Sequence, residues 1–195
     1  MAILLTPTTE LEAVNECLAN IGQTPVATVS GVIGVDAQQA LQLVRSITRE
    51  IQSEGWYWNT EVKYPLNRDA AGNIFIPSYC LSVDPDGDYR DRDYVARGNR
   101  LYDRTNHTYV FTENITVTMT LGLPFDELPE SARRYIALRA ARIFQNRTEG
   151  SNDPEDQQEE DRAYAMLRAD DLRVADNNML ADNWETIDLL RRYVY

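Results

Sequence analysis

The sequence predicts an α+β protein, in which a four-helix bundle built from both chain ends carries an inserted β-rich domain. Near both termini, apolar residues recur every three or four positions, which is typical of amphipathic helices. In the middle third they alternate with polar residues, which is typical of strands. Two helices alone make a poor core, whereas four can share one, so we expect the terminal segments to pair. The expected parts are residues 1–56 and 124–195, the helical domain with its C-terminal tail, and residues 57–123, the β-rich domain.

The first helical part contains two helices with recognisable ends. Thr9 and Glu12 have the spacing of a capping box, and an apolar stripe follows as far as Gly22, which is expected to close the helix. Asp36 is a suitable cap for the second helix, and Gly55 is expected to end it.

The middle third contains several short apolar alternations and one two-residue turn signal. The turn signal is Gly98-Asn99, which predicts a β-hairpin. The expected strands are Trp58–Leu66, Ile74–Ile76, Tyr79–Val83, Tyr94–Arg97, Arg100–Asp103 and Ile115–Leu121.

Helical periodicity returns after Pro124. Pro129 suits the first turn of a third helix, which a polar break at residues 146–152 should end. Asp153-Pro154 should begin the fourth. The apolar face of the third helix is Ala132, Ile136, Ala140 and Ile143, and that of the fourth is Ala163, Met166, Leu167 and Val174. Leu172 is expected on the opposite side of the fourth helix.

The composition limits the classes of function. The chain has 195 residues and a net charge of −12, which argues against a general phosphate-backbone binder. Lys63 is the only lysine; the dominance of arginine suits protein interfaces, or reflects a GC-rich genome. Cys17 and Cys80 form neither a disulfide framework nor a zinc site, so we expect reduced thiols. Residues 1–9 lack the pattern of a signal peptide, and no apolar run has the length of a membrane span.

Few residues have the pattern of a reactive site, and we expect neither enzymatic activity nor a cofactor or metal. His107 is the only histidine and stands in a turn-rich stretch. The aspartate-rich run 84–93 does not place glycine and glutamate where an EF-hand needs them. An alternative is a polysaccharide hydrolase, because a pair of the 31 acidic residues could act on a sugar and Trp56 and Trp58 could stack on it.

Opposite charges distinguish the last two helices. The third contains five arginines, and the fourth begins with six acidic residues, so these helices pair within one chain or between neighbouring subunits. Arg139 falls between Ile136 and Ile143 on the apolar face, where a cation requires a carboxylate or carbonyl partner. The candidate interface residues are Arg133, Arg139, Arg142, Glu159, Glu160 and Leu172.

Five stretches carry a resemblance to a known family: LEAVNECLANIG (11–22), REIQSEGW (49–56), RGNRLYDRT (97–105), FDELPESARRY (125–135) and FQNR (144–147). In their order and spacing they resemble the tail tubular protein A family, the adaptors (head-to-tail connectors) of short-tailed bacteriophages, or podoviruses. The likeness covers most of residues 10–165.

The resemblance implies a structural virion protein of the phage tail, made in the host cytoplasm. It implies a ring of twelve subunits that joins the portal protein to the tail nozzle (tail tubular protein B) and helps to dock tail fibres. DNA would pass through the ring during ejection without sequence-specific binding. An acidic lumen would repel the phosphate backbone and avoid trapping DNA.

Overall fold

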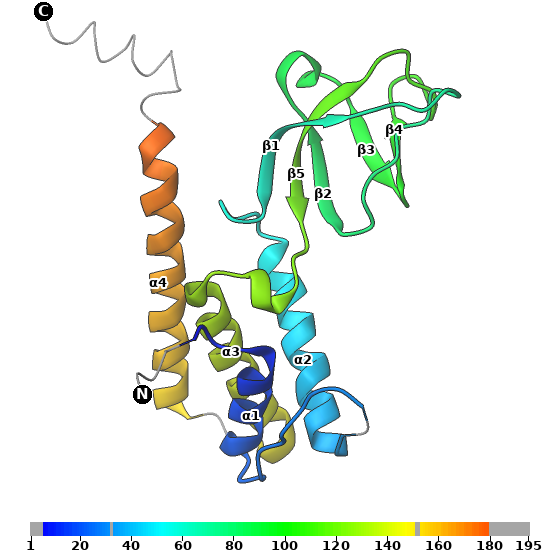
Figure 1. Cartoon of the computed structure of the whole chain (residues 1–195). Coiled ribbons are helices and arrows are strands. Elements are labelled where there is room, and N and C mark those ends of the chain that lie inside the picture. Colours follow the sequence, from blue (N-terminus) through cyan, green and yellow to red (C-terminus); the bar gives the residue numbers. More distant parts are fainter. Residues whose placement is uncertain (1–5, 32, 151–152, 180–195) are drawn as a thin grey trace, which may run out of the picture. The chain divides into compact units, whose positions relative to one another are not determined.

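The computed structural model describes residues 6–31, 33–150 and 153–179 and has an α+β fold (Figure 1). The helices are α1 (Glu10–Asn20), α2 (Val35–Gln52), α3 (Glu130–Glu149) and α4 (Pro154–Met179), with 3-10 turns at Gly87–Tyr89 and Phe125–Glu127. The strands are β1 (Thr60–Leu66), β2 (Cys80–Pro85), β3 (Tyr94–Arg97), β4 (Arg100–Asp103) and β5 (Ile115–Leu121).

The chain divides into two compact units. The helical unit contains residues up to 47 and from 128 onward, and the β unit contains residues 48–127. The predicted β-rich range, 57–123, lies inside the β unit, but the predicted domain boundaries themselves stay a prediction.

Local signals set the ends of α1 as the sequence predicts. The Thr9 hydroxyl accepts a hydrogen bond from the Glu12 amide, and the Glu12 carboxylate accepts one from the Thr9 amide, so the capping box is complete. Gly22 takes φ +67° just beyond the last turn, a conformation that glycine adopts without steric cost. The prediction that Gly22 closes the helix is confirmed.

The predicted cap of α2 was wrong by two residues. Asp36 lies inside the first turn, because the first helical hydrogen bond runs from the Gln38 amide to the Gly34 carbonyl. A carboxylate in the first turn still interacts favourably with the helix dipole. At the other end α2 finishes at Gln52, and Gly55 turns the chain with φ +75°.

The helical unit is held together by apolar contacts along α3. Helix α1 packs against α3, and α3 packs against α4 (Figure 1). The buried apolar residues include Val14 and Leu18 of α1, Ile136 and Phe144 of α3, and Leu167 of α4. A bundle in which α2 is the fourth member stays a prediction.

Helices α3 and α4 differ from the prediction at four points. Phe144 is buried and its neighbour Ile143 only half-buried, while α3 continues through the expected polar break to Glu149. On α4, Ala163 and Leu167 are buried, but Met166 is 70% and Val174 41% exposed. One residue is 100° of helix, so Met166 cannot share the centre of a face with both Ala163 and Leu167.

The β unit contains a three-stranded antiparallel sheet in the order β1-β5-β2 and a separate hairpin, β3-β4. The hairpin and β5 have the predicted bounds. Gly98 takes φ +63° at the first turn position, the place where a two-residue turn most needs glycine. Trp58 and Asn59 precede β1 rather than belonging to it, and Ile74–Ile76 makes only isolated bridges, to Arg68 and Arg100.

A β-bulge interrupts the pairing of β1 with β5. Val62 and Lys63 stand opposite the single residue Thr118, and Lys63 takes φ +57°. Asp86 stabilises this irregular point, since its carboxylate accepts hydrogen bonds from the Lys63 amide (3.3 Å) and the Thr118 hydroxyl (2.9 Å).

The two thiols should differ in reactivity. Cys17 is fully buried in the helical unit, and burial, with a smaller effect of the Glu16 charge, raises its pKa to about 12. At pH 8 the reactive thiolate form of Cys17 is then present in about one molecule in 10,000. Cys80 is half-buried, and burial also raises its pKa.

We therefore expect iodoacetamide at pH 8 to label Cys80 first and Cys17 only in denaturant, as measured by peptide mass spectrometry over time. Equal labelling rates in native buffer would contradict the buried environment of Cys17. The Cys80→Ser variant, in which only Cys17 can react, provides the control for unfolding during the reaction.

Candidate interaction surface

Two arginines of α3 converge on one buried carboxylate of α4. Glu160 is 5% exposed and accepts hydrogen bonds from Arg139 (3.1 Å) and from the Arg142 Nε (2.5 Å). Both arginine side chains are largely buried. The expectation that Arg139 has a carboxylate or carbonyl partner is confirmed, and that partner is the Glu160 carboxylate of the same chain.

The other candidate interface residues are distributed differently. Arg133 donates to the backbone carbonyls of Leu128 (2.7 Å) and Thr8 (3.0 Å), and so fixes the segment before α1 to the start of α3. Glu159 and Leu172 lie exposed on α4. Contacts of all six with a neighbouring subunit stay a prediction, and four of them already have roles within one chain.

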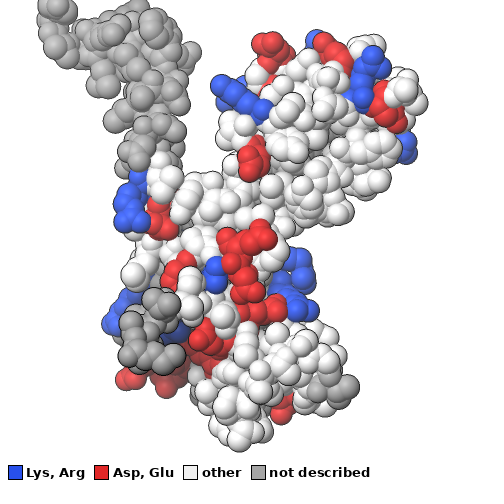
Figure 2. Space-filling model, viewed as in Figure 1, with Lys and Arg blue, Asp and Glu red and all other residues white. Residues whose placement is uncertain are grey.

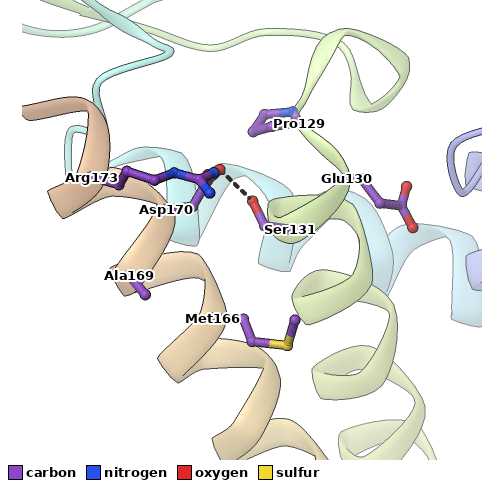
Figure 3. Close-up of a pocket in the computed structure, with 7 residues that line it drawn as sticks. All are labelled: Pro129, Glu130, Ser131, Met166, Ala169, Asp170 and Arg173. Atoms are coloured by element: carbon purple, nitrogen blue, oxygen red, sulfur yellow. Dashed lines mark hydrogen bonds and ion pairs between the residues drawn. The ribbon is translucent and has the colours of Figure 1, made fainter.

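A groove lies where the beginning of α3 meets the second half of α4 (Figure 3). Its volume is about 520 Å³, and its walls are Pro129, Glu130, Ser131, Met166, Ala169, Asp170 and Arg173. The Ser131 hydroxyl donates to the Asp170 carboxylate (3.0 Å) at one side, and the same carboxylate pairs with Arg173. The sequence analysis missed this groove because it placed Met166 in the core.

Helix α4 is acidic at its beginning and of mixed charge in its later turns. Asp153, just before the helix, and Glu155, Glu159 and Asp161 of its first turns are exposed, while Arg162, Arg168 and Arg173 are exposed further along, beside the half-buried Asp170 and Asp171. In Figure 2, acidic side chains gather around the beginning of α4, and both basic and acidic side chains lie beside its later turns. The pKa of Asp156 is raised by burial and by the charges of Asp153 and Glu159, so the acidic turns repel one another.

The β unit has an arginine–tyrosine stack. The Arg97 guanidinium lies 3.7 Å from the ring centre of Tyr102, and that of Arg100 lies 4.3 Å from Tyr109. The two ring centres are 4.7 Å apart and the rings are tilted by 59°, so the four side chains form one contiguous cluster. Each guanidinium is attracted by the electron-rich face of its tyrosine ring.

Trp56 and Trp58, the residues considered for sugar stacking, lie in packing positions. Trp56 is 1% exposed, its ring stacks on that of Trp58, and its indole N–H donates to the Ile51 carbonyl (2.6 Å). His107 is exposed in a turn, as expected.

Among residues 6–31, 33–150 and 153–179, no cluster of three or more His, Cys, Asp or Glu side chains is arranged to hold a metal ion. Within the same described part, no helix combines the length and apolarity of a bilayer span.

The molecule therefore presents an α+β fold whose distinctive surfaces are a groove between two helices and exposed, highly charged helix turns, which suit a protein that assembles with other proteins. Comparison of the sequence with known proteins identifies the kind of assembly to which this chain belongs. Residues 11–177 match the family described as tail tubular protein, and the chain belongs to this family. It is 28% identical over 166 residues to "Tail tubular protein A" of Klebsiella phage KP34, which covers 84% of this chain and 87% of that protein. It is thus a structural component of a bacteriophage tail, and it associates with other virion proteins.

Proposed function

We propose that this protein is the adaptor subunit of a short phage tail. Twelve copies form a ring that joins the portal protein to the tail nozzle, and the ring lines the channel through which DNA leaves the head. The same ring helps to dock the tail fibres. The observation that carries the proposal is the family match across residues 11–177, which includes parts of both compact units.

The charge distribution supports a role in a DNA channel. The net charge is −12, so a lumen formed by this chain repels phosphates and lets DNA slide past. All positively charged residues except Lys63 are arginines, and this composition favours bidentate contacts with other proteins over a surface of flexible lysine side chains.

The helical part of the adaptor is proposed to be one four-helix core, formed by helices from residues 1–56 and from residues 124–195, the range that also contains the C-terminal tail, with the β-rich range 57–123 inserted between them. Two contacts support this arrangement. Arg45 of α2 makes a bidentate ion pair with Glu10 of α1, with N–O distances of 2.8 and 3.0 Å. Arg134 of α3 forms an ion pair with Glu16 of α1 at 2.9 Å. The buried residues Ala40 and Val44 give α2 an apolar face within the helical unit.

Ring formation is tested by mixing the full chain with its cognate portal and imaging the particles by electron microscopy. We expect an added ring of twelve subunits on one end of each portal, whereas the isolated chain stays monomeric because its acidic subunits repel. A portal from an unrelated phage is the control and should remain bare. Cognate portals that remain bare at micromolar chain concentrations would overturn the adaptor assignment.

A further inference from the structure

The β3-β4 hairpin places two arginines directly opposite each other (Figure 1). Arg97 and Arg100 are paired across the strands on either side of the Gly98-Asn99 turn, so their side chains leave the hairpin on the same face. At such a position the two Cβ atoms are about 5 Å apart, and like charges destabilise the pairing. A local arrangement that costs stability is typical of a functional site.

Neither guanidinium contacts a carboxylate within residues 6–31, 33–150 and 153–179. Arg97 is exposed and lies on the Tyr102 ring. Arg100 is half-buried, lies on the Tyr109 ring, and donates a hydrogen bond to the side-chain carbonyl of Asn73 (3.3 Å). In this part of the chain the two like charges are therefore stabilised by aromatic rings and one neutral amide.

The acidic residues around the hairpin are engaged elsewhere. Asp93 forms an ion pair with Arg104 (3.4 Å). Asp103 is 6% exposed on the other face of β4, where its carboxylate accepts hydrogen bonds from the backbone and side-chain amides of Asn106. The Asp69 carboxylate accepts hydrogen bonds from amides of its own turn. The cationic face of the hairpin thus remains available to an anionic group from another molecule.

The tyrosine rings hold the two guanidinium groups in place. Tyr102 is 8% exposed, and the centres of the two rings are 4.7 Å apart. A guanidinium that stacks on a ring can still direct its N–H groups to a carboxylate, and a fixed side chain loses less entropy on binding. Phe75, paired with Arg100 on its other side, is 52% exposed and adds apolar area. Arginine beside aromatic residues is the composition of binding hot spots.

Two kinds of macromolecule carry suitable anionic groups, and an acidic protein segment fits this face better than DNA. The chain associates with other virion proteins. Its net charge of −12 repels an extended polyanion at long range. The Tyr102 ring is covered, so it offers no surface on which a nucleobase could stack. Carboxylates of a protein segment need only the short-range bidentate contacts that arginine provides.

We propose that the arginine–tyrosine cluster, defined as Arg97, Arg100, Tyr102 and Tyr109, binds an acidic segment of another virion protein. One carboxylate of that segment pairs with each guanidinium, and an apolar side chain of the segment packs on Phe75. The contact does not depend on the proposed ring, because it requires only that the chain associates with a second virion protein.

Photo-cross-linking in assembled particles tests the contact. A photoreactive phenylalanine analogue replaces Asn99, which is exposed in the turn between the two arginines, and the full chain is supplied to a phage that lacks its own copy. We expect mass spectrometry of illuminated particles to place the cross-link on a different virion protein, in a peptide with carboxylates beside the linked residue. Cross-links to DNA, to a second copy of this chain or to a peptide without carboxylates would overturn the proposal.

Charge reversal provides a second measurement. Arg97→Glu with Arg100→Glu should lower the cross-link yield by about tenfold, and introducing arginines at the linked carboxylates should restore it. Arg97→Lys with Arg100→Lys keeps the charge but loses the planar bidentate contact, so we expect an intermediate loss. Arg68→Glu with Arg90→Glu reverses two exposed arginines elsewhere in the β unit and should leave the yield unchanged. An equal loss in this control pair would assign the effect to net charge and overturn the proposal.

A single substitution separates binding from folding. Arg97→Glu replaces the like-charge pair by an opposite-charge pair, so the urea midpoint of the isolated chain should stay the same or rise. The cross-link yield should nevertheless fall. A lower midpoint together with a lower yield would show that Arg97 has a structural role, and the binding site would be wrong. If portals carry no ring while this cross-link forms as expected, only the adaptor assignment fails.

Discussion

The Glu160→Ala variant should lose about 2–3 kcal/mol of unfolding free energy, measured by urea denaturation followed by circular dichroism. Glu160 is the shared partner of Arg139 and Arg142, so its removal takes from two largely buried guanidinium groups the carboxylate that binds both. The expected loss is smaller than for fully buried pairs, because the arginine side chains keep 26% and 21% of their exposure and recover some hydration.

Two companion variants separate the ion cluster from general effects of substitution on α4. Glu159→Ala changes the exposed neighbouring carboxylate and should alter stability by less than about 0.5 kcal/mol. Replacing Arg139, Arg142 and Glu160 together by Met, Leu and Leu should recover most of the loss, since the cost comes from uncompensated charge and not from missing attraction. A single Glu160→Ala variant as stable as Glu159→Ala would contradict this explanation.

Sequence periodicity predicted those elements whose signals are local. The hairpin at 94–103 and strand β5 have the predicted bounds, because alternation and a Gly-Asn turn are contained within ten residues. The capping box of Thr9 and Glu12 is likewise a contact across three residues. In each case the chain needs no distant partner to specify the geometry.

For features that depend on residues far apart in the sequence, the sequence predicted that a contact exists but not which residues make it. The position of Arg139 on an apolar face required a partner, but the choice of Glu160 follows from the antiparallel register of α3 and α4, which periodicity does not encode. The exposure of Met166 follows from the same register. The bulge at Lys63 has no local signal, because the carboxylate of Asp86 that stabilises it comes from another part of the β unit.

The Gln52 and Asn59 side chains illustrate the same limit more strongly, since the sequence analysis gave neither a role. Gln52 is 1% exposed and pairs with the backbone of Leu123 in both directions, donating to the carbonyl (3.0 Å) and accepting from the amide (2.7 Å). The Gln52 amide group thus makes with Leu123, 71 positions away, the two backbone hydrogen bonds that a neighbouring strand would otherwise make. A polar residue at the end of an amphipathic helix gives no sequence signal that it is buried.

Asn59→Ala should destabilise the β unit by about 3–4 kcal/mol, because two buried hydrogen bonds and one partly buried hydrogen bond disappear while their backbone partners stay shielded from water. The Asn59 side chain is 2% exposed, accepts from the Trp56 amide (2.8 Å), and donates to the carbonyls of Gln52 (2.9 Å) and Leu121 (2.8 Å). It thus joins the end of α2 to strand β5. The measurement is urea denaturation followed by tryptophan fluorescence, which reports on the neighbouring Trp56.

Asn59→Asp gives this prediction a pH signature. The introduced carboxylate keeps the acceptor for Trp56 but faces two carbonyl oxygens, so burial and repulsion raise its folded-state pKa above the unfolded value. A raised folded-state pKa means that the folded protein binds more protons, so the penalty relative to wild type should shrink as pH falls from 7 to 5. Asn114→Ala, which removes one exposed hydrogen bond to the Arg68 amide, should cost less than about 1 kcal/mol at either pH. A pH-independent penalty at Asn59→Asp would show that the side chain is solvated, and the buried bridge between α2 and β5 would be wrong.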